Sequence, residues 1–362
     1  MQYILILFWL FFAAIMGHTG GMHRRVKVLG REERRATQLY AWIVMLPILY
    51  MTVTRSNYFG DTYQYMLDYR SIPSGLAGKW SYIQSHTKDT GFYALGALVS
   101  IFAGNHFRYF FLVVALIQGY CLMKTYRKYS EDYWFAIFTF VATTDYLSWM
   151  FNGIRQFTAV AITFAAAEPI FKKQYVKACL IIAFASLFHK SALMMIPIIF
   201  IVQGRPWNWK TILVILGTVV IMSASGVFTD TLDTVLADTQ YSNVVSDWRG
   251  GGDDGTNPLR VLVYSIPTIL SLFCRKKIAK SGDRVIQVAC NMSIISMALY
   301  LVSMVTSGIF MGRLPIYCSL YANGILLPWE FKHVFGRQMR SLAIGCYVLF
   351  YIFQLRYAWG VF

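Results

Sequence analysis

Charge is scarce in this sequence, and acidic residues are scarcer than basic ones. Only 14% of the 362 residues are Asp, Glu, Lys or Arg, against about 25% in soluble domains. Hydrophobic residues make up 57%, and the mean hydropathy is +0.49. This composition argues against a soluble protein and predicts a polytopic membrane protein. The net charge of +16 does not indicate nucleic-acid binding, because the basic residues lie in short loops between apolar runs, as topology signals do.

Several motifs with a known chemistry are also missing. No GxSxG, HExxH, Walker A or DxD motif occurs, which argues against serine hydrolases, zinc proteases, P-loop ATPases and metal-dependent nucleotide-sugar transferases. The cysteines lie within or at the ends of apolar runs, without CxxC or CxxH spacing, so neither a disulfide framework nor a zinc site is indicated. They are Cys121, Cys179, Cys274, Cys290, Cys318 and Cys346. We expect neither a metal nor another cofactor.

The sequence does contain a long series of apolar runs. We interpret about twelve of them (range about 10 to 14) as membrane spans of an all-α, single-domain fold covering residues 1–362. The runs comprise residues 3–16, 38–53, 109–123, 133–151, 157–171, 175–188, 191–203, 211–227, 260–274, 285–310, 314–329 and 341–358. The run 91–103 is predicted to be a re-entrant or interfacial helix. Because the first run lacks a basic start and a cleavage site, we interpret it as a retained helix and not a signal peptide.

The distribution of basic residues predicts the orientation. Loops on one side of this arrangement hold 22 of the 33 Lys and Arg residues. These loops are residues 21–36, 124–132, 172–177, 204–210, 275–284 and 332–340. By the positive-inside rule they are cytoplasmic, which places both termini and the long loops 54–90 and 225–259 outside. The second of these loops is rich in Asp, and its glycine-rich stretch 250–255 is interpreted as a flexible tip.

Three basic residues on the outer side are exceptions to this rule. Arg155, Lys190 and Arg313 each lie in a short turn that precedes or opens a helix running inward. The positive end of such a helix dipole, next to a cation, favours an anion. His189, beside Lys190, adds a group that can exchange a proton near neutral pH. These turns therefore predict an anion site near the outer leaflet.

The outer stretch 55–70 supplies a further element. Asp61, Tyr65 and Asp68 are spaced i, i+4 and i+7, so they share one face if the chain is helical from Thr62 onward. An anionic ligand would be bound by Arg55, which leaves Asp61 to act on a hydroxyl group.

Each of these residues also has a purely structural interpretation. Arg155 and Arg313 could be snorkelling anchors at helix ends. Asp61 could be the N-cap residue of a capping box, which would not exclude a catalytic role. His189 could be an interfacial histidine followed by Ser191 as a helix cap.

Four short motifs follow one another along the chain at the expected outer helix ends. They are Arg55 with Gly60-Asp61-Thr62 and Tyr65, then Asn152-Gly153-Ile154-Arg155-Gln156, then Phe188-His189-Lys190-Ser191, and finally Arg313 with Tyr317. In their order and placement they resemble the EpsG branch of the Wzy-like bacterial polysaccharide polymerases, over about residues 50–325. Lys190 departs from the pattern as a charge beside the histidine, and the loop 225–259 matches no part of it.

The resemblance implies a fold similar to the GT-C-type glycosyltransferases, with a catalytic cavity at the outer face of the bacterial plasma membrane. The donor would be a growing glycan on undecaprenyl diphosphate, and the acceptor an oligosaccharide repeat unit on a second such lipid. The product would be an exopolysaccharide, capsule or O-antigen. By the resemblance alone, a regulator of chain length is also an expected partner.

The residues fit this chemistry. With no metal or nucleotide sugar involved, arginines and helix N-termini must stabilise the leaving diphosphate, and a carboxylate or neutral imidazole must take the proton of the acceptor hydroxyl. We expect Arg155 and Arg313 to bind the diphosphate, with Arg55 as a further ligand, and His189 or Asp61 to be the general base. The expected supporting residues are Gln156, Tyr65, Tyr317, Lys190 and Asn152.

Two other classes of membrane protein stay open. A lipid-linked oligosaccharide flippase would bind the same lipid, but it should line a central path with cations deep in the membrane, whereas the charges here cluster near the outer ends. A membrane O-acyltransferase would place its histidine to meet an acyl donor from the cytoplasm, on the side opposite to that expected for His189.

Overall fold

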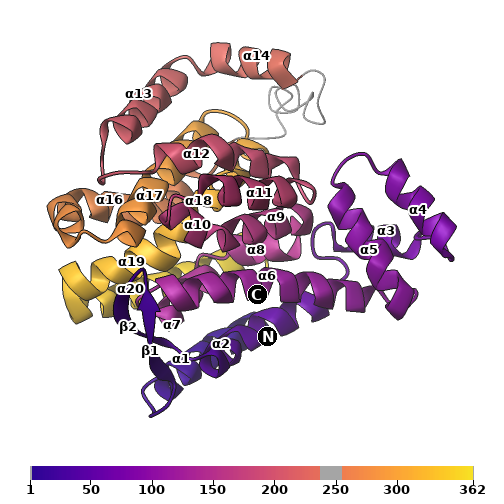
Figure 1. Ribbon diagram of the computed structural model, residues 1–362, viewed down its shortest axis with the longest axis horizontal. Helices are drawn as coiled ribbons and strands as arrows, with labels where there is room; N and C mark the ends of the chain where they lie inside the picture. The colour runs from indigo at the N-terminus through magenta and orange to yellow at the C-terminus, as the bar shows by residue number, and fades with distance from the viewer. Residues whose placement is uncertain (1, 237–254, 362) are drawn as a thin grey trace. The chain divides into compact units, whose positions relative to one another are not determined.

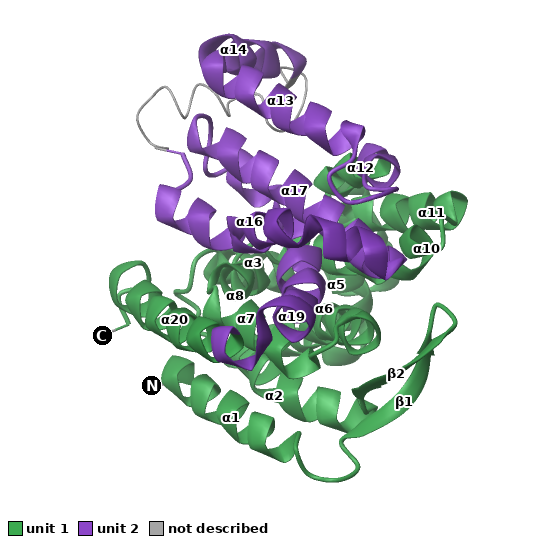
Figure 2. Ribbon diagram, turned by 90° about the vertical axis from the view of Figure 1, so that its left-hand side faces the viewer, with its two compact units in different colours: residues 1–196, 340–362 green, residues 197–339 purple. Residues whose placement is uncertain are grey.

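The computed structural model describes residues 2–236 and 255–361, and within them the only strands form one short hairpin (Figure 1). The chain forms two compact units, coloured green and purple in Figure 2. Unit 1 consists of Met1–Ile196 and Arg340–Phe362, and unit 2 of Pro197–Met339. The expected stretch 250–255 falls largely on residues 237–254, which lie outside the described part.

Unit 1 contains most of the N-terminal helices and the C-terminal helix. Its elements are α1 (Gln2–Met16), β1 (His23–Val28), β2 (Arg31–Ala36), α2 (Gln38–Thr54), α3 (Thr62–Arg70), α4 (Leu76–Ser85), α5 (Thr90–Ala103), α6 (Phe107–Tyr129), α7 (Tyr133–Ala142), α8 (Asp145–Phe151), α9 (Ile154–Ala165), α10 (Ala167–Phe171), α11 (Tyr175–Ser186), the 3₁₀ helix η1 (Lys190–Met194) and α20 (Gly336–Tyr357). The residues of α20 that precede Arg340 are assigned to unit 2.

Unit 2 contains the remaining elements. They are α12 (Met195–Ile201), which begins at the boundary, α13 (Trp209–Ser223), α14 (Ser225–Leu236), α16 (Pro258–Ser281), α17 (Arg284–Met304), the 3₁₀ helix η3 (Met311–Arg313), α18 (Ile316–Tyr321), the π-helical segment η4 (Ala322–Leu326), α19 (Leu327–Glu330) and the π-helical segment η5 (Phe331–Phe335).

The parallel pairing of α6 and α9 organises unit 1. Buried Gln118 of α6 donates through Nε2 to the carbonyl of Ile154 (3.2 Å) and to Oγ1 of Thr158 (2.9 Å), and further along α6 Thr125 donates to the carbonyl of Phe164 (3.2 Å). Contacts that advance together along both helices show that the helices run in the same direction. The predicted topology requires the same direction, because the spans 109–123 and 157–171 are separated by one other span.

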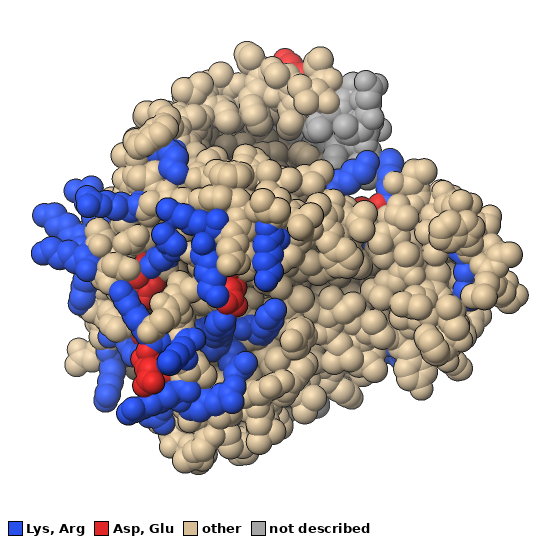
Figure 3. Space-filling view, viewed as in Figure 1, with Lys and Arg blue, Asp and Glu red and all other residues tan. Residues whose placement is uncertain are grey.

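The helices of unit 1 bring the expected inner loops together at one end, which we call the basic end. Arg35 of the hairpin donates through Nε to the carbonyl of Lys128 (3.1 Å), and the ammonium groups of Lys128 and Lys172 both bind Glu168 at 2.7 Å. Lys and Arg crowd the part of unit 1 that holds the hairpin and the C-terminal end of α6 (Figure 3). Three of the loops that the charge count places on one side therefore meet in unit 1.

The hairpin within the expected loop 21–36 was not predicted, and it corrects the expectation of a purely helical chain. Its strands pair antiparallel from His23 opposite Ala36 to Val28 opposite Arg31, which leaves Leu29 and Gly30 as a two-residue turn. Both have positive φ, at 48° and 89°, as a type I′ turn requires. Leucine is uncommon at a position with positive φ, and for this reason the turn is difficult to predict from the sequence.

Several expected spans are interrupted in the structure. The run 133–151 forms α7 and α8, because Thr144 adopts φ of 63° and the hydroxyl of Thr143 binds the carbonyl of Thr139 (2.9 Å), a local bond that competes with the helix. The run 157–171 divides where α9 ends at Ala165, the residue whose carbonyl the ring of Pro169 would contact in a continuing helix. In unit 2, the run 314–329 contains η4, which ends two residues before Pro328.

Three described helices are long and apolar enough to cross a membrane unaided, namely α6, α16 and α17. The pair α13 and α14 passes the same test together but is bent by 99°. Helix α13 falls on the expected span 211–227, whereas α14 lies in the loop expected at 225–259. Shorter apolar helices of 10 to 17 residues coincide with several other expected spans, and α5 confirms the helix expected at 91–103. The structure thus confirms a mainly helical protein in which three described helices, or four spans if the bent pair counts as one, could cross a membrane, while twelve spans stay a prediction.

Asp132 provides a test of how unit 1 is held together. One carboxylate oxygen caps α7 by accepting from the backbone N–H of Phe135 (3.0 Å), and the other binds the guanidinium of Arg340 in α20. We expect Asp132→Ala to lose both contacts and about 1 to 3 kcal/mol of stability. Asp132→Asn keeps an oxygen for the cap, so it should lose less. Thermal unfolding of the purified proteins in detergent measures this, and equal midpoints for the two variants would contradict the dual role.

Candidate functional site

Arg155 lies in the first turn of α9 and contacts three elements that precede α6. Its Nη1 donates to Oδ2 of Asp89 (3.0 Å) and to the hydroxyl of Tyr93 (3.5 Å), and its guanidinium lies 5.9 Å from the ring centroid of Tyr65. The side chain remains 35% exposed. An ion pair inside the protein is not what a snorkelling anchor needs, so these contacts favour the interpretation of Arg155 as part of a site.

Asp89 is the main residue of this site that the sequence analysis missed. It lies in the turn between α4 and α5, where it is only 5% exposed. The available signal was a carboxylate directly before the apolar run 91–103, but an ordinary N-cap gives the same pattern. In the structure Asp89 does hold the N-cap position of α5, yet its side chain makes no capping hydrogen bond.

Burial and the neighbouring positive charges act on the pKa of Asp89 in opposite directions. Burial raises the pKa of this carboxyl group, because the charged form loses its hydration. The positive charges of Arg155, Lys190 and Lys88 act in the opposite direction. The expected cation Lys190 therefore lies near enough to Arg155 for both to act on one carboxylate.

His189 and Gln156 meet through Ser191. His189 is the N-cap residue of η1, and its Nδ1 lies 2.6 Å from Oγ of Ser191 and accepts from the Ser191 backbone N–H (3.4 Å). Nε2 of Gln156, the neighbour of Arg155 in α9, donates to the same hydroxyl at 3.4 Å. The two expected motifs 152–156 and 188–191 are thus in direct contact. The histidine is the cap here, and not Ser191.

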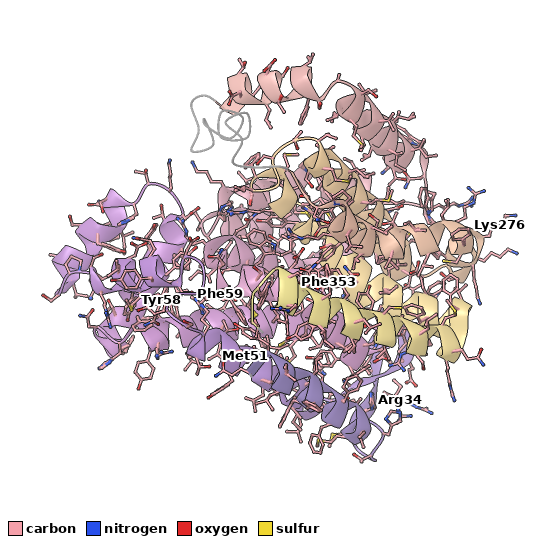
Figure 4. All side chains as sticks on the ribbon, turned by 180° about the vertical axis from the view of Figure 1, so that it is seen from behind. Arg34, Met51, Tyr58, Phe59, Lys276 and Phe353 are labelled. Atoms are coloured by element: carbon pink, nitrogen blue, oxygen red, sulfur yellow. The ribbon has the colours of Figure 1, made fainter. Side chains whose placement is uncertain are left out.

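Asp61 and Asn152 join the first two motifs. The backbone N–H of Asp61 donates to Oδ1 of Asn152 (2.6 Å), and Phe59 packs edge to face on Phe151 with ring centroids 5.6 Å apart. Figure 4 shows Phe59 in the stretch that follows α2, next to Tyr58. The expected helix from Thr62 is confirmed as α3. Asp61 precedes it as an exposed residue without the side-chain hydrogen bond of a capping box.

Arg55 and Tyr65 are buried beside this turn. Arg55, 4% exposed, donates to Oγ1 of Thr62 (3.0 Å) and to the carbonyl of Thr52, and it lies 4.2 Å from the ring centroid of Phe111. These contacts connect the end of α2 to the start of α3. A role of Arg55 as a diphosphate ligand stays a prediction, and its burial favours a structural role instead.

Arg313 and Tyr317 belong to unit 2. Arg313 ends η3, where Gly312 fits so closely against Thr256 that a Cβ would lie 2.6 Å from its hydroxyl. Tyr317 of α18 is buried. A common ligand for Arg313 and Arg155 stays a prediction. Within the described part of the chain, no group of three His, Cys, Asp or Glu side chains is arranged to hold a metal ion.

Gly60 tests the contact between the motifs. It has φ of +49°, and a Cβ there would lie 2.2 Å from Oδ1 of Asn152. We expect Gly60→Ala to displace Asn152 and to cost about 2 kcal/mol or more, from positive φ and steric overlap together. Gly104→Ala is the matched control, since Gly104 also has positive φ, at +55°, but no atom lies within 4 Å of its Cβ position. Thermal unfolding compares them, and equal midpoints would show that the close packing has no importance.

Comparison with known proteins agrees with the motifs. The EpsG family model matches residues 38–361, from the start of α2 almost to the end of the chain. No curated protein matches the chain, and no solved structure does either. Helix α1 and the hairpin precede the matched region. Because the family model covers nearly the whole sequence, the chain belongs to the EpsG family.

Proposed function

We propose that this protein polymerises lipid-linked oligosaccharide repeat units into a cell-surface polysaccharide. Membership of the EpsG family indicates a polysaccharide polymerase of the glycosyltransferase type. The finer proposal is that the donor is a glycan on undecaprenyl diphosphate, and that the acceptor is a repeat unit on a second such lipid. The reaction takes place on the outer face of the bacterial plasma membrane, in a fold with about twelve crossings similar to the GT-C enzymes.

The observation that carries this proposal is the position of Arg155. It opens α9, a helix of 12 residues, so the partial positive charge of the helix N-terminus adds to that of the guanidinium. Its side chain is one-third exposed, and Asp89 and Tyr93 restrain it. Lys190 supplies a second cation at the same end of unit 1. A leaving diphosphate gains negative charge as the glycosidic bond breaks, and such a centre stabilises it.

The hydrogen bonds of His189 favour a role as a donor over a role as a base. If Gln156 donates to Ser191, the Ser191 hydroxyl can donate to Nδ1 of His189. A neutral imidazole whose Nδ1 accepts carries its proton on Nε2, which is then a hydrogen-bond donor. His189 would therefore bind an oxygen of the diphosphate or of the sugar.

Asp61 is then the proposed general base. It is exposed, its carboxylate does not cap α3, and Asn152 fixes its backbone. It takes the proton of the acceptor hydroxyl as that oxygen forms the new bond to the anomeric carbon, and the diphosphate leaves with the bonding electron pair.

The direct test is a polymerisation assay. Purified protein in lipid nanodiscs, incubated with a lipid-linked repeat unit, should produce a ladder of products separated by one repeat unit each. Movement of labelled lipid across liposomes without any ladder would support a flippase and contradict the proposal.

Replacement of Arg155 by lysine tests the arginine. Arg155→Lys keeps the positive charge but loses the planar fork that binds two phosphate oxygens. We expect folded, membrane-inserted protein whose polymer yield falls by about tenfold to a hundredfold. Arg70→Lys, an exposed arginine in the last turn of α3, is the matched control and should retain full yield. Polymer of normal length and amount from Arg155→Lys would contradict the assignment.

Variants of similar shape distinguish which of the two candidate residues is the general base. His189→Gln places an amide N–H near the position of Nε2, so it should keep a measurable part of the rate if the imidazole is a donor. Asp61→Asn has no proton acceptor of comparable strength, and we expect a loss of about a hundredfold or more. Initial rates of ladder formation measure both. The opposite ranking would assign the base to His189.

A further inference from the structure

Asp89 and Arg155 differ strongly in exposure although they form one ion pair. The side chain of Asp89 is 4% exposed, whereas that of Arg155 is 35% exposed. The carboxylate is therefore enclosed by the protein, whereas part of the Arg155 side chain stays exposed. An incoming anion can bind the open part of Arg155 without displacing Asp89.

Asp89 is held in a costly arrangement. Its Oδ1 is buried and has no hydrogen-bond partner among the described residues, and burial of an unpaired polar atom is unfavourable. Its φ of 53° is in the left-handed region, which only a few residue types adopt readily. Local costs of this kind cluster at functional sites, where the surrounding structure supports them.

The turn that holds Asp89 is also fixed to the segment that carries Lys190. The backbone N–H of Gly91 donates to the carbonyl of Leu187 (2.8 Å), and a Cβ on Gly91 would lie 2.9 Å from the Cβ of Leu187. Leu187 is three residues before Lys190, whose charge acts on Asp89. Asp89 thus attracts two cations that come from separate elements.

We propose that Asp89 is a positioning residue, which holds Arg155 and Lys190 as a centre for the diphosphate group of a polyprenyl lipid. This inference rests on the proposed function of Arg155 as an anion ligand. Asp89 does not contact the lipid. It fixes the direction of the guanidinium before the ligand arrives, so that less conformational entropy is lost on binding.

Binding of farnesyl diphosphate to the full chain in nanodiscs tests this role without any polymerisation. Asp89→Asn keeps the shape of the side chain and tolerates positive φ, but it loses the charge. We expect its Kd to rise about tenfold, and in the polymerisation assay its loss should appear mainly in the KM of the donor. Asp230→Asn, at an exposed aspartate of α14 in unit 2, is the matched control and should bind like wild type.

A double-mutant cycle separates positioning from general stabilisation. If Asp89 acts through Arg155, Asp89→Asn combined with Arg155→Gln should bind no more weakly than Arg155→Gln alone. The double variant also removes both charges of the pair. It therefore leaves no unpaired buried charge that could destabilise the fold.

Each other outcome contradicts the inference in a distinct way. Tighter binding by Asp89→Asn would mean that the carboxylate competes with the ligand. Unchanged binding with lost turnover would make Asp89 a base, and additive effects in the cycle would make its role purely structural. In these three cases the proposed role of Arg155 stands. If wild-type protein binds no diphosphate, both the inference and that role fail.

Discussion

The parallel contact between α6 and α9 determines where the other functional groups of unit 1 lie. Two parallel helices begin at the same end, and the buried amide of Gln118 fixes their relative position. The segment that precedes α6 and the turn that precedes α9 therefore lie toward the same end of this helix pair. As a result Arg155 can reach Asp89 and Tyr93, although more than 60 residues separate it from each of them along the chain.

The turn between α8 and α9 has two structural tasks in addition to its proposed chemistry. Asn152 binds the backbone before α3, and Arg155 binds the carboxylate before α5. Both attachments hold the segment 55–103 against the helices of unit 1. A short motif can therefore contain residues for structural reasons as well as for its proposed chemistry, and Arg155 is available for both because its side chain stays 35% exposed.

Burial separates two arginines that look equivalent in the sequence. Arg55 and Arg155 both follow an apolar run, and both belong to the short motifs that resemble those of the family. Arg55 is almost fully enclosed, and it contacts Thr52, Thr62 and the ring of Phe111, although its buried Nη2 has no hydrogen-bond partner among the described residues. Arg155 keeps an open side and a single carboxylate partner. In a protein with so few charges, exposure is what distinguishes a structural cation from one that can bind a ligand.

The sequence by itself determined the class of protein, the family and the apolar helices, because hydrophobicity and short motifs are local properties of the chain. It also singled out Arg155, His189 and Asp61 as candidate site residues. Only the tertiary structure revealed the ion pair with Asp89, the hydrogen bond from Asp61 to Asn152 and the interruption at Thr144. These features depend on which distant segments meet and on how deeply each group is buried, and neither is encoded in local spacing.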